Sequence, residues 1–418
     1  MINDLKDKFD RAGGMETLAQ FTRAHVLGYA ALQTLLQGTS QKSLEIVRLS
    51  VSNRVQKKLR KKYSAYIQEY LKREREKQSA RAGKAAQGPQ ATVAGQATGA
   101  GKAPAAAQPA KKPEAAQAPA TAQKLDAEPA PATAQKLEAG LAPGAEQKLE
   151  TPQAPAASQP AHKPGKIWMF WSSGEESAPP IARKCIASIR ENLPDREVVV
   201  LSEKTYRDYV TFPSFIQEKI DRGEMMKAHM ADLLRLELLI RYGGTWIDAT
   251  VFCPGGKIPA YMLDSDLFLF QDLKPGFDGH CQRISNWMIT ARAGNPVLKL
   301  TRALLYEYWR EHRKCEDYFI FHHFFEMAID AYPEEWGRVI PFSNAAPHIL
   351  LLRLFEPYDD AVWEAVREMT PFHKLSYKFD EAKTQIPGTY YQELFGDEAG
   401  RAANSGAGSS EAGGAGSL

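Results

Sequence analysis

The aromatic residues of this chain fall in two parts, separated by a long segment that has none. Residues 85–165 contain no Phe, Tyr, Trp or Ile and consist largely of Ala, Pro and Gln. Such a composition cannot bury enough apolar surface to offset the entropy lost on ordering. In contrast, 35 of the 41 aromatic residues, including all seven Trp, lie in residues 166–395. We therefore expect one globular domain over 166–395, preceded by a disordered linker over 85–165.

The linker carries a repeat with a period of twelve residues. Pro119, Pro131 and Pro143 occupy equivalent positions in successive units, whose apolar side chains beyond Ala are one or two Leu. Stacked repeats need a hydrophobic core, which these units do not supply. The pattern therefore favours a flexible tether. Residues 396–418, rich in Gly, Ala and Ser, are expected to form a second disordered tail.

Residues 1–84 carry the net positive charge of the chain, with 18 Lys and Arg against 8 Asp and Glu. Helices are predicted over 15–37 and 43–78. The second helix has an apolar stripe at near-helical spacing, formed by Leu44, Val47, Val51, Val55, Leu59, Tyr66 and Tyr70. Basic residues lie opposite this stripe, namely Arg48, Arg54, Lys58, Lys61, Lys62, Lys72 and Arg73.

Two interpretations of this basic amphipathic helix stay open. One is a helix lying on an anionic membrane face. The other is a helix that packs against the main domain or against a second copy of the chain. Because the positive charge is limited to the N-terminal part, we expect no nucleic-acid partner.

The sequence has no apolar run long enough to span a membrane, and its start, MINDLKDKFD, lacks the apolar segment of a secretory signal. The four cysteines, Cys185, Cys253, Cys281 and Cys315, are far apart and form no CxxC pair. We therefore expect a cytoplasmic protein with reduced thiols and no zinc site. The membrane interpretation of residues 1–84 would place it peripherally at the inner membrane face.

Apolar strands alternate with helices over 166–395, which predicts an α/β fold with a mostly parallel sheet. The predicted strands are 166–171, 197–201, 245–252, 267–270 and 286–290, and the predicted helices are 181–191, 225–242, 296–312 and 318–331. Ligands of such sheets bind beyond the carboxyl ends of the strands. Neither a GxGxxG nor a GxxxxGK[ST] motif is present, so a dinucleotide fingerprint and a P-loop are excluded.

The segment most informative about chemistry is HMADLLRLELLIRYGGTWIDATVF. Asp232 and Arg235 are three residues apart on one predicted helix and so share a face. The helix is predicted to stop at Gly243-Gly244, and the following apolar strand delivers the carboxylate of Asp248. Mg²⁺ and Mn²⁺ take one or two such carboxylates together with phosphate oxygens and water. The alternative is an ordinary salt bridge on the helix and an Asp that caps a turn.

Through this helix–Gly-Gly–strand unit, the sequence resembles the bacterial capsular polysaccharide synthesis proteins. These are relatives of the DxD-bearing, sugar-nucleotide-dependent glycosyltransferases, which include the catalytic domains of the clostridial glucosylating toxins. The resemblance covers about residues 166–380. It consists of five blocks in one order: IWMFWSSGEESAPPIARKCIASIR, HMADLLRLELLIRYGGTWIDATVF, SNWMITARAGNPVL, DYFIFHHFF and FHKLSYK.

The resemblance implies a GT-A-type fold, that of the nucleotide-diphospho-sugar transferases. It also implies roles for four residues. Trp171 would stack on the donor base, and Asp232 would hold ribose or sugar hydroxyls. Arg235 would contact sugar or phosphate, and Asp248 would hold Mn²⁺ or Mg²⁺.

Five further residues complete the predicted site. Thr250 stands where the second Asp of the DxD signature would be, so another ligand has to complete the metal site, and His373 is the candidate. Asn286 is a candidate contact to a sugar hydroxyl, or else a cap at the strand edge. Lys374 or Lys378 would stabilise the charge that develops on the leaving phosphate.

These features predict a glycosyltransferase that moves a hexose from a nucleotide sugar, with UDP-hexose favoured, to a glycan or lipid-linked glycan in bacterial surface-polysaccharide synthesis. The resemblance implies that the reaction retains the anomeric configuration. No second carboxylate can be identified in the sequence as a covalent nucleophile, so a front-face mechanism is favoured. Residues 1–84 would contact an anionic membrane or the polysaccharide assembly machinery. A non-catalytic adaptor or scaffold and a metal-dependent sugar phosphotransferase are the alternatives.

Overall fold

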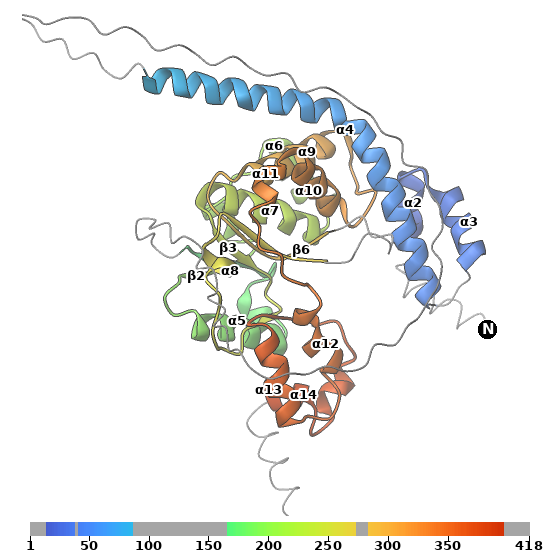
Figure 1. The fold of residues 1–418 in the computed structure, drawn as a ribbon. Coiled ribbons are helices and arrows are strands. Elements are labelled where there is room, and N and C mark those ends of the chain that lie inside the picture. The colour runs from blue at the N-terminus through green and yellow to red at the C-terminus, as the bar shows by residue number, and fades with distance from the viewer. Residues whose placement is uncertain (1–13, 38–40, 87–164, 273–282, 397–418) are drawn as a thin grey trace, which may run out of the picture. The chain divides into compact units, whose positions relative to one another are not determined.

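The computed structural model describes residues 14–37, 41–86, 165–272 and 283–396. Most of the predicted linker and tail lies outside these residues. Within them, the residues up to Arg81 and those from 165 onward belong to one compact unit. Many of the elements of this unit are labelled in Figure 1.

A five-stranded sheet forms the centre of the domain, in the order β2-β1-β3-β6-β5. Its strands are β1 (Ile167–Phe170), β2 (Val198–Leu201), β3 (Gly244–Ile247), β5 (Leu267–Gln271) and β6 (Ile284–Ala291). β1 is parallel to β2 and β3, whereas β6 is antiparallel to both β3 and β5. β1, β2, β3 and β5 thus run in one direction and the sheet is mixed. The expectation of a mostly parallel sheet fails at β6, because a strand entered directly from its neighbour can pair antiparallel without a helical crossover.

A second correction concerns the strand predicted over 245–252. β3 ends at Ile247, and the chain turns so that Val251 N–H donates to the carbonyl of Asp248 (3.0 Å). It then enters β4 (Val251–Phe252), which pairs antiparallel with β7 (His373–Lys374) in a separate two-stranded sheet. The break places Asp248 at the carboxyl end of β3, between the two sheets.

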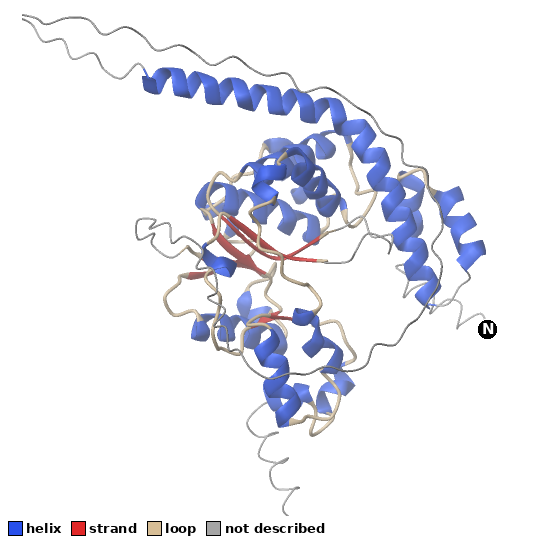
Figure 2. Ribbon diagram, viewed as in Figure 1, coloured by secondary structure: helices blue, strands red, loops and turns tan. Residues whose placement is uncertain are grey.

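Helices cover both faces of the central sheet (Figure 2). On one face, Trp168 and Trp246 pack with α7 (Lys227–Tyr242), α9 (Pro296–Glu311) and α10 (Ile320–Ala331). On the other face, alternate strand residues such as Met169, Ile247 and Met288 pack with α5 (Pro180–Asn192). Trp168, Trp246, Trp287 and Trp309 are all buried.

The remaining helices are shorter and surround these layers. They are α6 (Ser214–Asp221), α8 (Tyr261–Asp264), α11 (Pro333–Trp336), α12 (Ile349–Arg353), α13 (Asp360–Met369) and α14 (Tyr390–Phe395). Leu350, Val366 and Tyr390 of α12–α14 form a third core with Ile181 and Cys185 of α5. Of the cysteines, Cys185, Cys253 and Cys315 are buried free thiols, and Cys281 lies outside the described residues.

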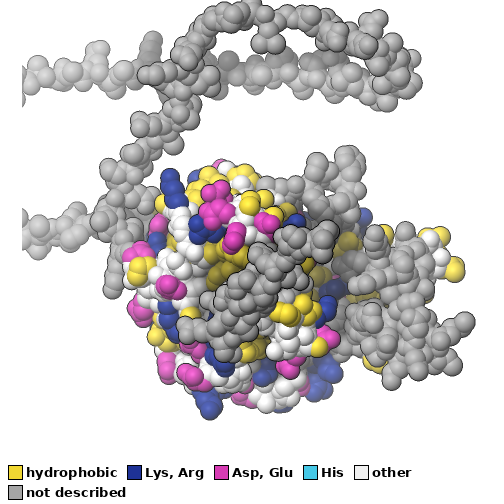
Figure 3. Space-filling view, turned by 90° about the horizontal axis from the view of Figure 1, so that it is seen from below, with side chains coloured by type: hydrophobic (Ala, Val, Ile, Leu, Met, Phe, Trp, Pro, Cys, Tyr) yellow, Lys and Arg dark blue, Asp and Glu magenta, His cyan; other side chains and the backbone are white. Residues whose placement is uncertain are grey.

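Lys and Arg are interspersed with Asp and Glu on the face seen in Figure 3. Exposed ion pairs such as Arg367–Glu364 (2.7 Å) occur in the structure. Each such pair contributes roughly 0–1 kcal/mol at most. The stability of the fold therefore rests on the buried layers and not on these pairs.

The junction between α7 and β3 needs its two glycines. Gly243 and Gly244 have φ values of 68° and 92°, in the region that side chains disfavour. A Cβ on Gly244 would also lie 2.3 Å from the carbonyl oxygen of Lys166. The predicted helix stop at this pair is confirmed, and it lets β3 run close beside the start of β1.

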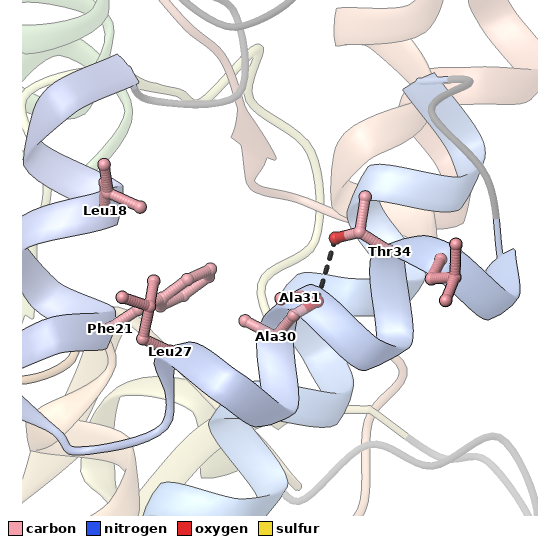
Figure 4. Close-up of a pocket in the computed structure, with 7 residues that line it drawn as sticks. Leu18, Phe21, Leu27, Ala30, Ala31 and Thr34 are labelled. Atoms are coloured by element: carbon pink, nitrogen blue, oxygen red, sulfur yellow. Dashed lines mark hydrogen bonds between the residues drawn. The ribbon is translucent and has the colours of Figure 1, made fainter.

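The N-terminal region contains α2 (Gly14–Arg23), α3 (Leu27–Gln37) and α4 (Gln41–Ala86). The single helix predicted over 15–37 is wrong, because His25 has a left-handed φ of 54° that a continuous helix cannot contain. An apolar pocket lies between α2 and α3 (Figure 4). Its lining residues, Leu18, Phe21, Leu27, Ala30, Ala31, Thr34 and Leu35, include none of the predicted site residues.

The apolar stripe of α4 packs against the domain. Val47, Val51, Val55, Leu59 and Tyr63 are each at most 3% exposed and belong to the same core as α7, α9 and α10. A face buried in this way is not free to insert into a membrane, so the structure favours the packing interpretation for α4. None of the helices in the described ranges is long and apolar enough to cross a membrane.

Candidate active site

Four of the predicted residues meet in one hydrogen-bonded cluster. The Oδ1 atom of Asp232 accepts hydrogen bonds from Arg235 (2.6 Å) and from the amide of Asn286 (2.9 Å). Arg235 also reaches Asp248, whose Oδ1 lies 3.4 Å from Nη2. We call Asp232, Arg235, Asp248 and Asn286 the acidic cluster.

The sheet topology explains why these residues meet. Trp171 follows β1 and Asp248 follows β3, and these parallel neighbours end at the same edge of the sheet. β6 runs the other way, so Asn286 near its beginning lies at that edge too. Asp232 and Arg235 share one face of α7, the helix that packs over β1, β3 and β6.

Asp232 is kept ionised although it is only 7% exposed. Burial alone would raise its pKa, but His229 and the positive charge of Arg235 hold that pKa below its ordinary value. The Nδ1 atom of His229 is 3.7 Å from Asp232 Oδ2. Burial opposes a charge on His229, yet its neighbours Cys315 and Asp232 raise its pKa to about 10. The buried carboxylate of Asp232 is thus paired with two buried cations, His229 and Arg235.

Arg235 is fixed in place by rings as well as by carboxylates. Its guanidinium lies 4.8 Å from the ring centre of Trp246 and 5.5 Å from that of Phe321. The side chain is only 4% exposed. Arg235 therefore holds Asp232 and Asp248 in fixed positions and cannot swing toward solvent.

Asp248 is the more accessible carboxylate, with 30% of its side chain exposed. Trp246 Nε1 donates to its Oδ1 atom (2.9 Å), and Lys374 Nζ lies 3.8 Å from its Oδ2 atom. Lys374 also donates to the hydroxyl of Thr250 (2.7 Å). The structure thus brings Lys374, which is distant in the sequence, to Asp248 and Thr250.

Trp171 and Lys378 lie near one another and not within the acidic cluster. Trp171 packs edge-to-face on Tyr377, with ring centres 5.1 Å apart. Lys378 is exposed, and its Nζ atom is 5.9 Å from the same Tyr377 ring. Trp171 is half-buried at the sheet edge that also carries Asp248, so a ligand extending along this edge would reach both.

The structure does not bring His373 to Asp248. His373 pairs with Phe252 and Lys374 with Val251, and successive residues of a strand point to opposite faces. Lys374 takes the face toward Asp248, whereas the fully buried ring of His373 lies 5.8 Å from that of Trp363. Within the described part of the chain, neither ring nitrogen of His373 has a hydrogen-bond partner.

The burial of His373 predicts a loss of stability in mild acid. Burial lowers its pKa to about 4, from 6.5 when exposed. Between these values the unfolded chain binds a proton that the folded chain does not, so the free energy of unfolding falls as the pH falls. His373→Leu should therefore lose less stability than the wild type between pH 7 and pH 5, measured by urea unfolding. Equal losses in both proteins would contradict the buried neutral histidine.

The residues around Asp248 provide only a few of the ligands that a metal ion requires. No group of three or more His, Cys, Asp and Glu side chains in the described segments is placed to hold a metal ion. Asp248 and Thr250 offer a carboxylate and a hydroxyl, both oxygen donors. One carboxylate is enough for a Mg²⁺ or Mn²⁺ whose other ligands are substrate phosphates and water. The expected metal remains a prediction.

Two residues beside the acidic cluster are not among the predicted ones. His229 is three residues before Asp232 on the same helix. The three-residue spacing that pairs Asp232 with Arg235 therefore also predicts that His229 lies beside Asp232. Tyr318 lies 6.0 Å from His229 between ring centres. It comes from the loop before α10, and no local pattern in the sequence connects it with α7.

The geometry defines an α/β protein with buried carboxylates and cations gathered at the ends of its strands. Residues 122–394 match the model of the capsular polysaccharide synthesis protein family. Because the match covers more than half of the chain, the protein belongs to this family, and the resemblance seen in the sequence is confirmed. The match begins well before β1, among residues that the structure does not describe.

Two relatives are named O-glycosyltransferases. One, braB from Annulohypoxylon truncatum, is 30% identical over 162 residues, which is 34% of this chain and 37% of that protein. The other, PaGT from Phomopsis amygdali, is 23% identical over 176 residues, covering 38% of this chain and 42% of the relative. The chain thus matches less than half the length of either relative. Among solved structures, the PaToxG glycosyltransferase has 15% identity and a TM-score of 0.31, covering 56% of this chain and 86% of that one.

Proposed function

We propose that this protein is a GT-A-type glycosyltransferase that moves a hexose from a nucleotide sugar, with UDP-hexose favoured, to a glycan or lipid-linked glycan acceptor. The observation that carries the proposal is the acidic cluster, which fixes two carboxylates at the edge of the sheet where ligands of α/β folds bind. Membership of the capsular polysaccharide synthesis family and the names of the two relatives support it.

The acidic cluster suits the recognition of a sugar. Asp232 is ionised and rigid, and its carboxylate accepts hydrogen bonds, as needed for sugar or ribose hydroxyls. Asn286 offers an amide that both donates and accepts. Arg235 is held between two aromatic rings, so its role is to orient the carboxylates and to present a fixed positive charge. Trp171, on the same sheet edge, is proposed to stack on the donor base.

Departure of the nucleoside diphosphate requires positive charge beside it. When the bond between the anomeric carbon and the diphosphate oxygen breaks, negative charge develops on the diphosphate. Lys374 is proposed to stabilise that charge, and its contacts with Asp248 and Thr250 fix its position. We propose that Asp248 and Thr250 are the protein ligands of a Mn²⁺ or Mg²⁺ ion. A bound cation there would supply further electrostatic stabilisation of the diphosphate.

A front-face reaction with retention of configuration is the proposed stereochemical course. The acceptor hydroxyl would form the new bond to the anomeric carbon on the face that the diphosphate leaves, and its proton would pass to the diphosphate oxygen. Asp232 and Asp248 are the carboxylates of the acidic cluster, and both are held by Arg235. A carboxylate so engaged is a weak nucleophile, which argues against a covalent intermediate.

A donor-hydrolysis screen tests the proposal. The full-length protein is incubated with UDP-, GDP- and CDP-hexoses in the presence of Mn²⁺, and nucleotide release is measured. We expect one class of donor to be hydrolysed, and Asp232→Asn to abolish most of that release. Asp221→Asn, which changes an exposed Asp at the end of α6, is the matched control. If the wild type releases no nucleotide from any donor of the panel, the proposal is overturned and the adaptor alternative is favoured. Release of a sugar phosphate would indicate the phosphotransferase.

A further inference from the structure

The loop between α9 and α10 joins the N-terminal helix α4 to the acidic cluster. On the α4 side, the hydroxyl of Ser52 donates to Asp317 Oδ2 (2.9 Å), and His323 Nε2 lies 3.0 Å from the same oxygen. The other oxygen of Asp317 accepts from Phe319 N–H (2.9 Å). Ser52 is 3% exposed and His323 is fully buried. Asp317 therefore links α4, the loop and α10 in one buried network.

Two further contacts from the N-terminal helices hold the same loop. Arg23, at the end of α2, donates from Nε to the carbonyl of Cys315 (2.9 Å). The guanidinium of Arg48 on α4 lies 5.1 Å from the ring centre of Phe319. The loop is thus held before and after residue 318 by side chains that come from outside the α/β domain.

The residue between these anchors lies beside the acidic cluster, next to His229. The ring of Tyr318 lies 6.0 Å from that of His229, which is ion-paired with Asp232. Tyr318 is nevertheless 43% exposed, unlike the residues that hold its loop. Burial of part of the side chain and the charges of Asp232 and Asp248 raise its pKa, so its hydroxyl stays protonated. A phenol of this kind can donate to a sugar oxygen and pack its ring against an apolar sugar face.

We propose that Tyr318 is a substrate-contacting residue beside the acidic cluster, and that Ser52 on α4 and Asp317 in the loop are positioning residues that fix it. The proposal rests on the proposed function, because the substrate is the sugar of donor or acceptor. It gives α4 a part in catalysis, in addition to its packing. The alternative is that the Ser52–Asp317–His323 network serves stability alone and that Tyr318 is an ordinary surface residue.

Kinetics of single variants in the full-length protein separate these possibilities. Tyr318→Phe keeps the ring and removes the hydroxyl, and Ser52→Ala removes the hydrogen bond to Asp317. Tyr318→Phe should lower kcat/KM about fivefold, as expected for one lost hydrogen bond, and Tyr318→Ala at least about tenfold. Ser52→Ala should change the same kinetic parameter as the Tyr318 variants. The matched control is Arg60→Ala, which removes the α4 ion pair with Asp330 (2.5 Å) outside the loop and should leave the kinetics unchanged.

The double variant Ser52→Ala/Tyr318→Ala gives the decisive comparison. If Ser52 acts through Tyr318, the double variant should be no slower than Tyr318→Ala alone. Additive losses, or a Ser52→Ala variant that changes only the melting temperature, would overturn the positioning role. Wild-type kinetics in Tyr318→Ala would overturn the proposal while leaving the proposed function intact. A wild type that hydrolyses no donor would overturn both.

Discussion

Replacing Asp248 by Asn should lower donor turnover at least about a hundredfold, a loss of roughly 2.7 kcal/mol of transition-state stabilisation. Asn keeps the shape and the oxygen that accepts from Trp246 Nε1 but removes the charge that faces Lys374 and would attract a divalent cation. The melting temperature should change little, because the side chain is 30% exposed. Steady-state hydrolysis of the preferred donor is the measurement.

Two companion variants sharpen this result. Asp264→Asn changes an exposed Asp that pairs with Arg196, and it should leave turnover unchanged. Thr250→Asp restores the second carboxylate of the DxD signature and should tighten the apparent binding of Mn²⁺, if a metal is used. Wild-type turnover in Asp248→Asn at saturating donor would show that this carboxylate has no role in the reaction.

Replacing Arg235 by Met should have the largest effect on folding. The change leaves Asp232 buried without its closest cation and removes that cation from between Trp246 and Phe321. Removing one partner of a buried ion pair typically costs about 3–5 kcal/mol. We expect a loss of this size in the free energy of unfolding, measured by urea denaturation, and a loss of donor turnover.

A second substitution identifies the cause of that loss. Asp232→Asn in the Arg235→Met background removes the buried carboxylate that has lost its arginine, so it should recover part of the stability although it removes a further site residue. Arg235→Lys keeps the charge but not the planar fork, and it should fall between the wild type and Arg235→Met. An Arg235→Met protein as stable as the wild type would show that the buried pair does not stabilise the fold.

The part of the site that the sequence predicts is the part that local geometry determines. The spacing of Asp232 and Arg235 on one helix, the stop at Gly243-Gly244 and the delivery of Asp248 by a strand all depend on residues close in the chain. The helices 296–312 and 318–331 agree with α9 and α10 within two residues because their apolar periodicity is strong.

The errors concern features that depend on distant segments. Whether His373 or Lys374 faces Asp248 is set by the register of β7 against β4, and a shift of one residue exchanges the two. The direction of β6 depends on its place between β3 and β5. Tyr318 comes to lie beside His229 through its loop, which the N-terminal helices contact. None of these relations has a signature in the local sequence.

The packing of α4 has a consequence for synthesis on the ribosome. Ser52 and Asp317 are 265 residues apart, and Arg23 and Cys315 are 292 apart. At a translation rate of about 5–20 residues per second, α4 emerges roughly 13–53 seconds before its partner loop. Throughout that interval the Val and Leu side chains of α4 have no α9 or α10 to cover them. The nascent chain therefore presents an uncovered apolar helix face, and this part of the domain core can close only after α10 has been made.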